Sequence, residues 1–118
     1  QLPLFHDVAL NAIAEHGVDV NPILFGHLGD GNLHFNLSAP KGTDSASFLK
    51  QHQDLLNSLV HEAILQCGGT VSAEHGIGQL KAELLRDITS AGNYRMFQAI
   101  KLAMDPKNLF NPGKLVLM

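Results

Sequence analysis

The sequence has little of several residue types, and each scarcity excludes a class of protein. Its 118 residues include no tryptophan, one tyrosine and a single cysteine, Cys67. One cysteine excludes an intrachain disulfide framework and is typical of a reducing compartment. No apolar run approaches the roughly 20 residues of a membrane-spanning helix, and the first residues show no signal-peptide pattern. We therefore expect no membrane span.

Charge and glycine patterns argue against two further kinds of site. Eight Lys and Arg stand against eleven Asp and Glu, giving a formal net charge of −3, and the basic residues form no cluster. This balance argues against nucleic acid as the main partner. A glycine-rich dinucleotide fingerprint is also missing, so we expect no cradle for a pyrophosphate in this chain. The length allows one small domain with a single core.

Hydrophobic spacing predicts an α+β fold. The predicted helices span 2–16, 46–66, 79–87 and 93–104, and the predicted strands span 22–28, 32–38 and 70–74. A tail over 109–115 is expected to be irregular but apolar enough to dock. This order fits an antiparallel sheet with helices packed on one face, a partial ferredoxin-like (split βαβ) unit lacking its first strand. The abrupt first helix and thin sheet suggest part of a larger domain.

Asp30 and Gly31 between the first two strands predict a tight hairpin. Asp-Gly is a strong signal for a two-residue type I′ turn, because both central residues need positive φ. Three pairs then lie opposite one another: Gly29 with Asn32, Leu28 with Leu33, and His27 with His34. Directly opposed residues have Cβ atoms roughly 5 Å apart. The turn is the expected role of Asp30, and metal ligation by its carboxylate is the alternative.

The hairpin has two different faces. Alternation predicts a core face made of Leu24, Leu28, Leu33, Phe35 and Leu37. It predicts a polar face that carries His27, Asn32, His34 and Asn36. Histidine is abundant in this chain, with seven residues, and we interpret the two imidazoles on this face as candidate metal ligands. The alternative is that both are ordinary polar side chains.

A second polar group, Glu74 and His75, follows the third predicted strand. Two imidazoles and one carboxylate are a common ligand set for zinc, iron or manganese. Neighbouring strand residues face opposite sides, so both can reach one site only if the strand breaks, which Gly76 and Gly78 favour. A helix is expected directly after Gly78, and its first N–H groups would favour a nearby anion.

The tetrapeptide Ala-Glu-His-Gly is weak support by itself, because it occurs twice. The copy at 14–17 ends a predicted helix, where His16 and Gly17 are explained by capping. Only the copy at 73–76 lies between a predicted strand and a glycine turn. The remaining histidines, His6, His52 and His61, are expected to be ordinary partly exposed helix residues, and Cys67 to be packed.

Three segments in order resemble the C-terminal part of the FAD-linked oxidase family. They span 26–36 (GHLGDGNLHFN), 71–78 (VSAEHGIG) and 105–114 (DPKNLFNPGK). The family includes enzymes of the D-lactate dehydrogenase, glycolate oxidase flavin subunit and D-2-hydroxyglutarate dehydrogenase types. The resemblance implies that residues 1–118 are one domain, the C-terminal part of the cap or substrate domain. The FAD-binding domain is absent from this chain, so the 118 residues alone are expected to be inactive.

The resemblance also implies site roles. His27, His34 and Glu74 would hold a divalent metal, usually zinc, and His75 would be the general base. Asn36 would contact the substrate, whereas two further residues would lie toward the cofactor: Asn32 and Asn111. The reaction implied is oxidation of a D-2-hydroxy acid to a 2-oxo acid, with hydride transfer to FAD held mainly by the missing domain. The alternative function is a stand-alone, non-redox metal-binding module.

The remaining implications concern partners and location. The substrate is a small 2-hydroxy acid, and the electron acceptor is a quinone, a cytochrome or an electron-transfer flavoprotein. A homodimer is among the open oligomeric states. The location is cytoplasmic in a bacterium, with membrane association through partners left open, or mitochondrial in a eukaryote.

Overall fold

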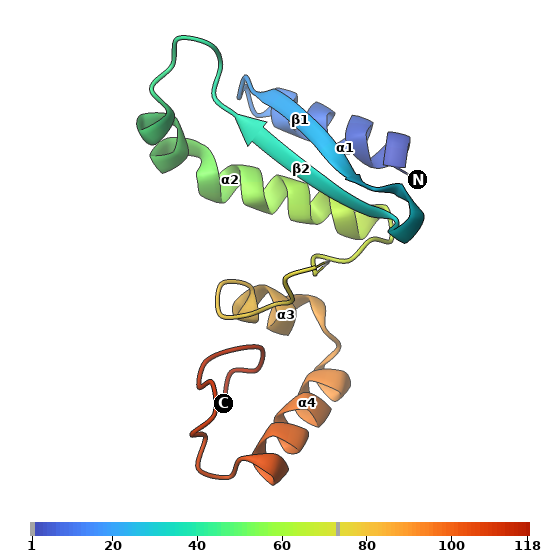
Figure 1. Cartoon of the computed structure of the whole chain (residues 1–118), viewed down its shortest axis with the longest axis vertical. Helices are drawn as coiled ribbons and strands as arrows, with labels where there is room; N and C mark the ends of the chain where they lie inside the picture. Colours follow the sequence, from blue (N-terminus) through green and yellow to red (C-terminus); the bar gives the residue numbers. More distant parts are fainter. Residues whose placement is uncertain (1, 73) are drawn as a thin grey trace. The chain divides into compact units, whose positions relative to one another are not determined.

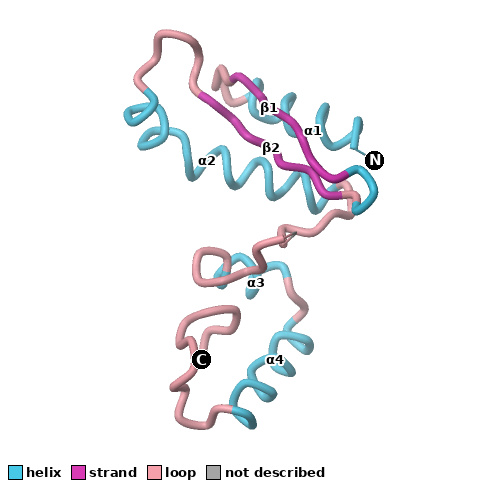
Figure 2. The backbone as a smooth tube through the Cα atoms, in the orientation of Figure 1, coloured by secondary structure: helices cyan, strands magenta, loops and turns pink. Residues whose placement is uncertain are grey.

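The computed structural model describes residues 2–72 and 74–118 and has an α+β fold, as predicted. Figures 1 and 2 show the elements, which are α1 (Leu2–Glu15), β1 (Asn21–His27), the 3-10 turn η1 (Leu28–Asp30), β2 (Asn32–Ser38), α2 (Ser45–Gln66), α3 (Ala82–Ile88) and α4 (Ala91–Met104). The chain divides into two compact units between Val71 and Ser72. No described helix is both long and apolar enough to cross a membrane.

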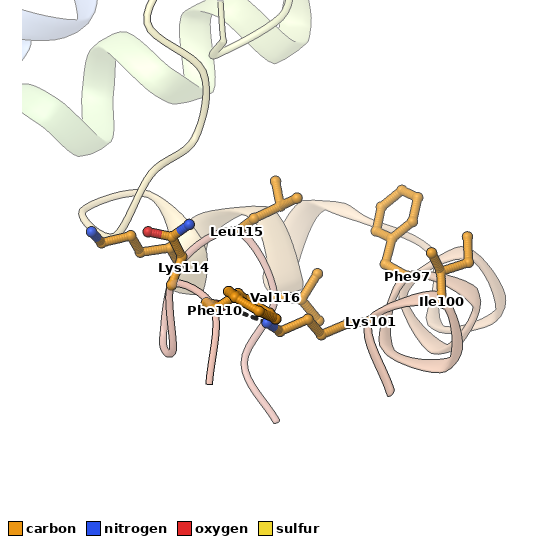
Figure 3. Close-up of a pocket in the computed structure, with 8 residues that line it drawn as sticks. Phe97, Ile100, Lys101, Phe110, Lys114, Leu115 and Val116 are labelled. Carbon is orange, nitrogen blue, oxygen red and sulfur yellow. Dashed lines mark hydrogen bonds between the residues drawn. The ribbon is translucent and has the colours of Figure 1, made fainter. Parts of the chain in front are cut away.

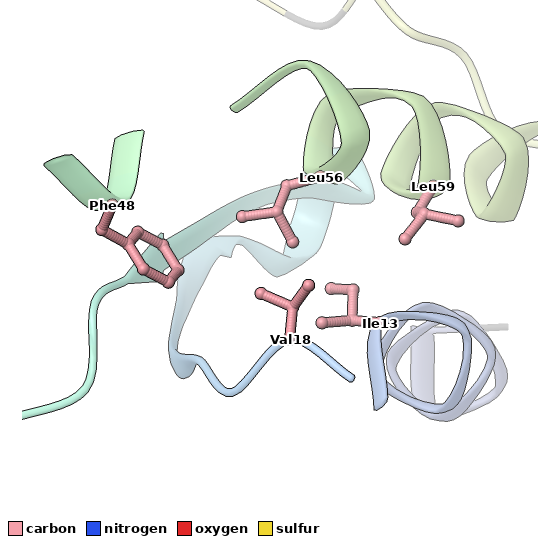
Figure 4. Close-up of a cluster of buried hydrophobic side chains, with 5 residues drawn as sticks. All are labelled: Ile13, Val18, Phe48, Leu56 and Leu59. Atoms are coloured by element: carbon pink, nitrogen blue, oxygen red, sulfur yellow. The ribbon is translucent and has the colours of Figure 1, made fainter. Parts of the chain in front are cut away.

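The first unit packs α1 and α2 against one face of the β1–β2 hairpin. Its buried side chains form two clusters, one of Ile13, Val18, Phe48, Leu56 and Leu59 (Figure 4) and one of Phe5, Ala9 and Ala63. Three β2 side chains, Leu33, Phe35 and Leu37, pack against these clusters. Phe35 meets Phe5 of α1 edge-on, with ring centroids 5.1 Å apart. The predicted core face is therefore confirmed for β2, while the side chain of Leu28 lies outside what the structure describes.

Local capping chemistry marks the end of α1 and both ends of α2, and both helices end where the sequence predicts. Gly17 follows α1 with φ +70°, and His16 Nδ1 lies 2.8 Å from the carbonyl oxygen of Ala12. At the start of α2, the Asp44 side chain accepts a hydrogen bond from the Ser47 N–H, which lowers the pKa of that carboxyl. Gly68, with φ +70°, follows the end of α2. Glycine suits these positions because it adopts positive φ without steric cost.

The hairpin register differs from the prediction by two residues. His27 pairs with Asn32, Gly26 with Leu33 and Phe25 with His34. The predicted pairing of His27 with His34 is wrong because the turn is longer, with η1 and Gly31 between the strands. Only Gly31 has positive φ there, at +66°, whereas a type I′ turn needs positive φ at Asp30 as well. A shift of two residues keeps the side chains of residues 21–27 and 32–38 on their predicted faces.

The third predicted strand is not formed in its described residues, 70–72 and 74. Ala73, which the prediction also included, lies outside the described residues. The sheet of the described chain has two strands, β1 and β2. A strand forms only as part of a sheet, and residues 70–72 belong to neither strand of the described sheet. Local sequence preference alone does not decide whether a segment joins a sheet.

The second unit contains α3, α4 and the C-terminal tail. The break between the helices falls at Thr89 and Ser90 rather than near Gly92, because the Ser90 hydroxyl caps α4 by accepting from the Asn93 N–H. The α4 helix ends before Asp105, as predicted. The predicted tail, 109–115, is irregular as expected, but its large apolar side chains are exposed: Leu109, Phe110 and Leu115. The buried contact comes after the predicted range, at Val116.

Two hydrogen bonds fasten that end of the tail to α4. The Leu117 N–H donates to the Tyr94 hydroxyl at 2.9 Å, and Gln98 Nε2 donates to the Leu117 carbonyl oxygen at 2.9 Å. Tyr94 is itself buried, and the end of the tail packs against the side of α4 that carries it. The tail is thus irregular in backbone conformation but held by specific contacts.

Candidate metal and active site

His27 and His34 lie together on the open face of the hairpin. Their ring centroids are 6.0 Å apart and their planes are inclined by 73°. They are diagonal neighbours rather than a directly opposed pair, since His27 faces Asn32 across the strands. His27 is exposed and His34 is half-buried. The structure thus brings two imidazoles within reach of one small ion, although the register that does so is not the predicted one.

Phe25 is part of this face and was missed by sequence reasoning. Its ring stacks on the His34 imidazole with centroids 4.7 Å apart and planes within 6° of parallel. Strand alternation could have found it, because residues 25 and 27 of one strand share a face. The face is therefore less polar than predicted, since Ile23 also lies on it and both apolar side chains are 54% exposed.

Gly26 allows β1 to approach β2 closely at a point next to His27. A Cβ built on Gly26 would overlap the Asn32 carbonyl oxygen and lie 3.0 Å from the Leu33 Cα. Only glycine fits this approach. The Gly-His pair of the first motif therefore has a steric basis: the glycine lets β2 approach, and His27 follows it at the end of β1.

The two asparagines of the hairpin have different surroundings. Asn32 is half-buried and faces His27 across the strands. Asn36 is exposed, faces Ile23 in the register, and borders a cavity of about 320 Å³ beside α2. The α2 side of that cavity carries Gln53, Asn57 and His61 as polar groups. Both asparagines can donate and accept hydrogen bonds.

Glu74 and His75 belong to the second unit and are exposed. Positive φ at Gly76 (+64°) and Gly78 (+59°) confirms the predicted glycine turn after them. The expected helix directly after Gly78 is wrong, because α3 begins only at Ala82. The predicted anion site at a helix start beside Gly78 therefore has no structural basis.

Asn111 lies in the tail and borders a cavity of about 540 Å³ in the second unit, shown in Figure 3. The cavity is lined by aromatic and aliphatic side chains together with two cations, Lys101 and Lys114. Asn111 has φ +48°, a conformation that asparagine tolerates better than most residues. The Leu115 N–H donates to the Gly78 carbonyl oxygen at 2.8 Å. This bond ties the residue directly after the third sequence motif to the last residue of the second.

Asp105 organises the start of the tail. Its carboxylate is buried and accepts from Lys101 Nζ at 2.6 Å and from the N–H groups of Leu109 and Phe110 at 2.9 Å each. Lys101 also donates to the Phe110 carbonyl oxygen, drawn dashed in Figure 3. The Lys101 hydrogen bond, and then the two backbone donors, lower the pKa of Asp105 from 3.8 to about 2 against the opposing effect of burial.

The other histidines have local roles, as expected. His6 bonds its neighbour Asp7 at 2.9 Å, His16 caps α1, and His52 packs on Phe48 with ring centroids 4.9 Å apart. Cys67 packs against the Phe5 cluster, as predicted. Of the three predicted metal ligands, the two imidazoles, His27 and His34, lie together within the first unit, whereas Glu74 belongs to the second.

The imidazole pair suits a divalent metal by its donor chemistry. Neutral histidine nitrogens are good ligands for zinc, iron and manganese. The Phe25 ring stacks on a face of the His34 imidazole, whereas the nitrogens of that imidazole lie at the ring edge. The first unit therefore offers two of the three or four ligands that such an ion requires.

Comparison with known proteins identifies the family of the chain. The family model for the C-terminal domain of FAD-linked oxidases matches residues 1–115. A D-2-hydroxyglutarate dehydrogenase from Stutzerimonas stutzeri (strain A1501) is 36% identical over 103 residues, 87% of this chain and 22% of the relative. The glycolate oxidase subunit GlcD from Bacillus subtilis (strain 168) is 34% identical over 108 residues, 91% of this chain and 22% of that protein.

An archaeal relative shows the same coverage. A D-lactate dehydrogenase from Archaeoglobus fulgidus is 36% identical over 102 residues, which are 86% of this chain and 21% of the relative. The chain thus spans about a fifth of the length of these relatives. The family match, in contrast, covers nearly all of the chain. The chain belongs to the FAD-linked oxidases, as their C-terminal domain.

Proposed function

We propose that this chain is the C-terminal part of the substrate domain of an FAD- and metal-dependent enzyme that oxidises a D-2-hydroxy acid to a 2-oxo acid. The observation that carries the proposal is the His27–His34 pair on an open sheet face, in a chain of this family. The relatives' names, which include a D-2-hydroxyglutarate dehydrogenase and a D-lactate dehydrogenase, support a 2-hydroxy acid as substrate.

The metal site of the proposal consists of His27, His34 and Glu74. The first two contribute imidazole nitrogens, and the third contributes a carboxylate oxygen from the motif after α2. Zinc accepts this mixed set and leaves a coordination position for substrate. A divalent metal held there would lower the pKa of the substrate hydroxyl and orient the Cα–H bond.

His75 is the general base of the proposal. Histidine is the usual residue for proton transfer near neutral pH. A ring nitrogen of His75 would take the hydroxyl proton as the hydride leaves the substrate carbon. Support comes from its exposure and from its place next to Glu74, before a glycine turn that bends the chain. FAD, when bound, supplies the acceptor for the hydride.

Three asparagines complete the proposal. Asn36 contacts the substrate, and Asn32 and Asn111 lie toward the cofactor. The position of Asn36 beside a cavity, and that of Asn32 opposite His27, support these roles. Asn111 lies in a tail that is hydrogen-bonded back to the Gly78 turn, and its own cavity carries two lysines.

His75→Ala in the full-length protein tests the proposal. We expect kcat with a D-2-hydroxy acid and an artificial electron acceptor to fall by roughly 10²- to 10⁴-fold, because the proton acceptor is lost. The matched control is His16→Ala, which changes the histidine of the other Ala-Glu-His-Gly copy and should leave kcat within about twofold of the parent.

Two outcomes would contradict the proposal. Near-normal turnover by His75→Ala would remove the assigned base. Metal binding by the full-length protein, without flavin reduction by any D-2-hydroxy acid tried, would instead indicate a non-redox metal-binding module.

A further inference from the structure

The most specific contact on the open hairpin face is the stack of Phe25 on His34. The two residues are directly opposed across β1 and β2, and their rings are parallel to within 6°. The centroid separation of 4.7 Å is within the range of interacting aromatic pairs. Phe25 therefore covers one face of the imidazole.

Phe25 is not needed by the core. It belongs to neither buried cluster, and it lies on the face opposite to the one that packs on α1 and α2. Its side chain is 54% exposed although it is large and apolar. The Phe25 ring stacks on His34, so we look for the role of Phe25 in its effect on the orientation of that imidazole.

A stacked ring constrains an imidazole in a way that matters for ligation. A metal binds a histidine nitrogen in the plane of the ring, at the edge, whereas stacking occupies the face. Phe25 can thus restrict rotation of the His34 ring without covering the ring edge, where the nitrogens lie. Groups that fix the orientation of a ligating histidine commonly affect metal affinity strongly.

The angle between the two histidine rings makes the orientation of the His34 ring important for metal binding. Their planes meet at 73°, so a rotation of the His34 ring changes the direction of its nitrogens relative to those of His27. His27 lies at the end of β1, next to the η1 turn, and is exposed. His34 lies within β2 and is half-buried.

We propose that Phe25 is a positioning residue for the metal site, holding the His34 imidazole in the plane that ligation requires. The inference rests on the proposed metal-binding function of His27 and His34. In this role Phe25 acts through His34, on which its ring stacks. The chemistry needs an aromatic ring at position 25, not merely an apolar side chain.

Zinc titration of the metal-free full-length protein tests this role. Phe25→Leu keeps an apolar side chain but removes the ring, and we expect the Kd for Zn²⁺ to rise by about 3- to 10-fold, the equivalent of one aromatic pair. Phe25→Tyr restores the ring and should restore the affinity. Leu4→Ala removes a similarly exposed side chain, 57% against 54%, on α1 and should leave the affinity unchanged.

The outcomes separate the inference from the proposal beneath it. Zinc affinity in Phe25→Leu equal to that of the parent, or equally reduced in Phe25→Tyr, would overturn the positioning role alone. Failure of the parent protein to bind Zn²⁺ would overturn the metal site and the inference with it. Thermal unfolding of each variant accompanies the titration, and a loss of affinity at unchanged Tm supports positioning rather than a folding defect.

Discussion

At the scale of one residue, Gly26 shows that a position of the first sequence motif can be required for steric reasons. The β2 backbone runs so close to it that an added methyl group would meet the Asn32 carbonyl oxygen. Asn32 also faces His27, the neighbour of Gly26 on β1. A displacement of Asn32 would therefore change the surroundings of the imidazole pair as well as the hairpin.

Gly26→Ala should destabilise the first unit by about 1–3 kcal/mol, because backbone must shift to admit the methyl group. Chemical denaturation of the protein measures this change. Gly29→Ala is the matched control, since a Cβ there would have nothing within 4 Å and Gly29 has no positive φ. It should change stability by no more than about 0.5 kcal/mol. Equal effects of the two substitutions would refute the steric explanation.

At the scale of one element, the tail is held by Asp105 at one end and by Val116 at the other. Asp105 accepts from Lys101 and from two tail N–H groups, and the low pKa of about 2 follows from these three donors. The pKa is lower in the folded chain than the ordinary 3.8, so ionised Asp105 stabilises the fold. That contribution is complete above about pH 4 and is lost as the pH falls toward 2.

Lys101→Met should move this acid transition upward. Without the ammonium group, the pKa of Asp105 returns toward 3.8, and protonation releases the tail at higher pH than in the parent. The check is amide-exchange protection of Leu109 and Phe110 by NMR between pH 5 and 2. Asp87→Asn is the control, because Asp87 is exposed and pairs only with its neighbour Arg86 among the ion pairs described. Identical protection profiles for Lys101→Met and the parent would exclude the proposed link.

At the scale of the whole molecule, this chain corresponds to only part of the length of its relatives. It matches about a fifth of their length, and the family model assigns it to the C-terminal domain. The imidazole pair, the Glu74–His75 motif and the tail all come from this domain, so it supplies ligands and a base in the proposal. Redox chemistry belongs to the flavin, when bound.

Removal of the metal should abolish turnover without unfolding the protein. We expect His27→Ala to retain less than about a tenth of the bound metal, since a lost ligand costs more than a lost outer-sphere group. Metal analysis and turnover on the full-length protein check this, with His52→Ala as the control because His52 packs on Phe48 in α2. Full metal content in His27→Ala would contradict the assigned ligand.

The sequence by itself determined the two helices of the first unit, the presence of the hairpin and the faces of its strands. Helix ends at Gly17 and Gly68 follow from short-range chemistry, because glycine adopts the positive φ that stops a helix. Strand faces depend only on alternation, so His27 and His34 share a face even though the register differs from the prediction by two residues. The family resemblance likewise needed only the order of three motifs.

Tertiary structure alone decided the register, the absence of a strand over the described residues 70–72, and the stack of Phe25 on His34. Register depends on the length and conformation of the whole turn, and Asp30 does not take the positive φ that a two-residue turn requires. A strand forms only with a partner, which no local pattern supplies. Ring contacts depend on which residues face each other across the sheet, and that is a property of the folded pair of strands.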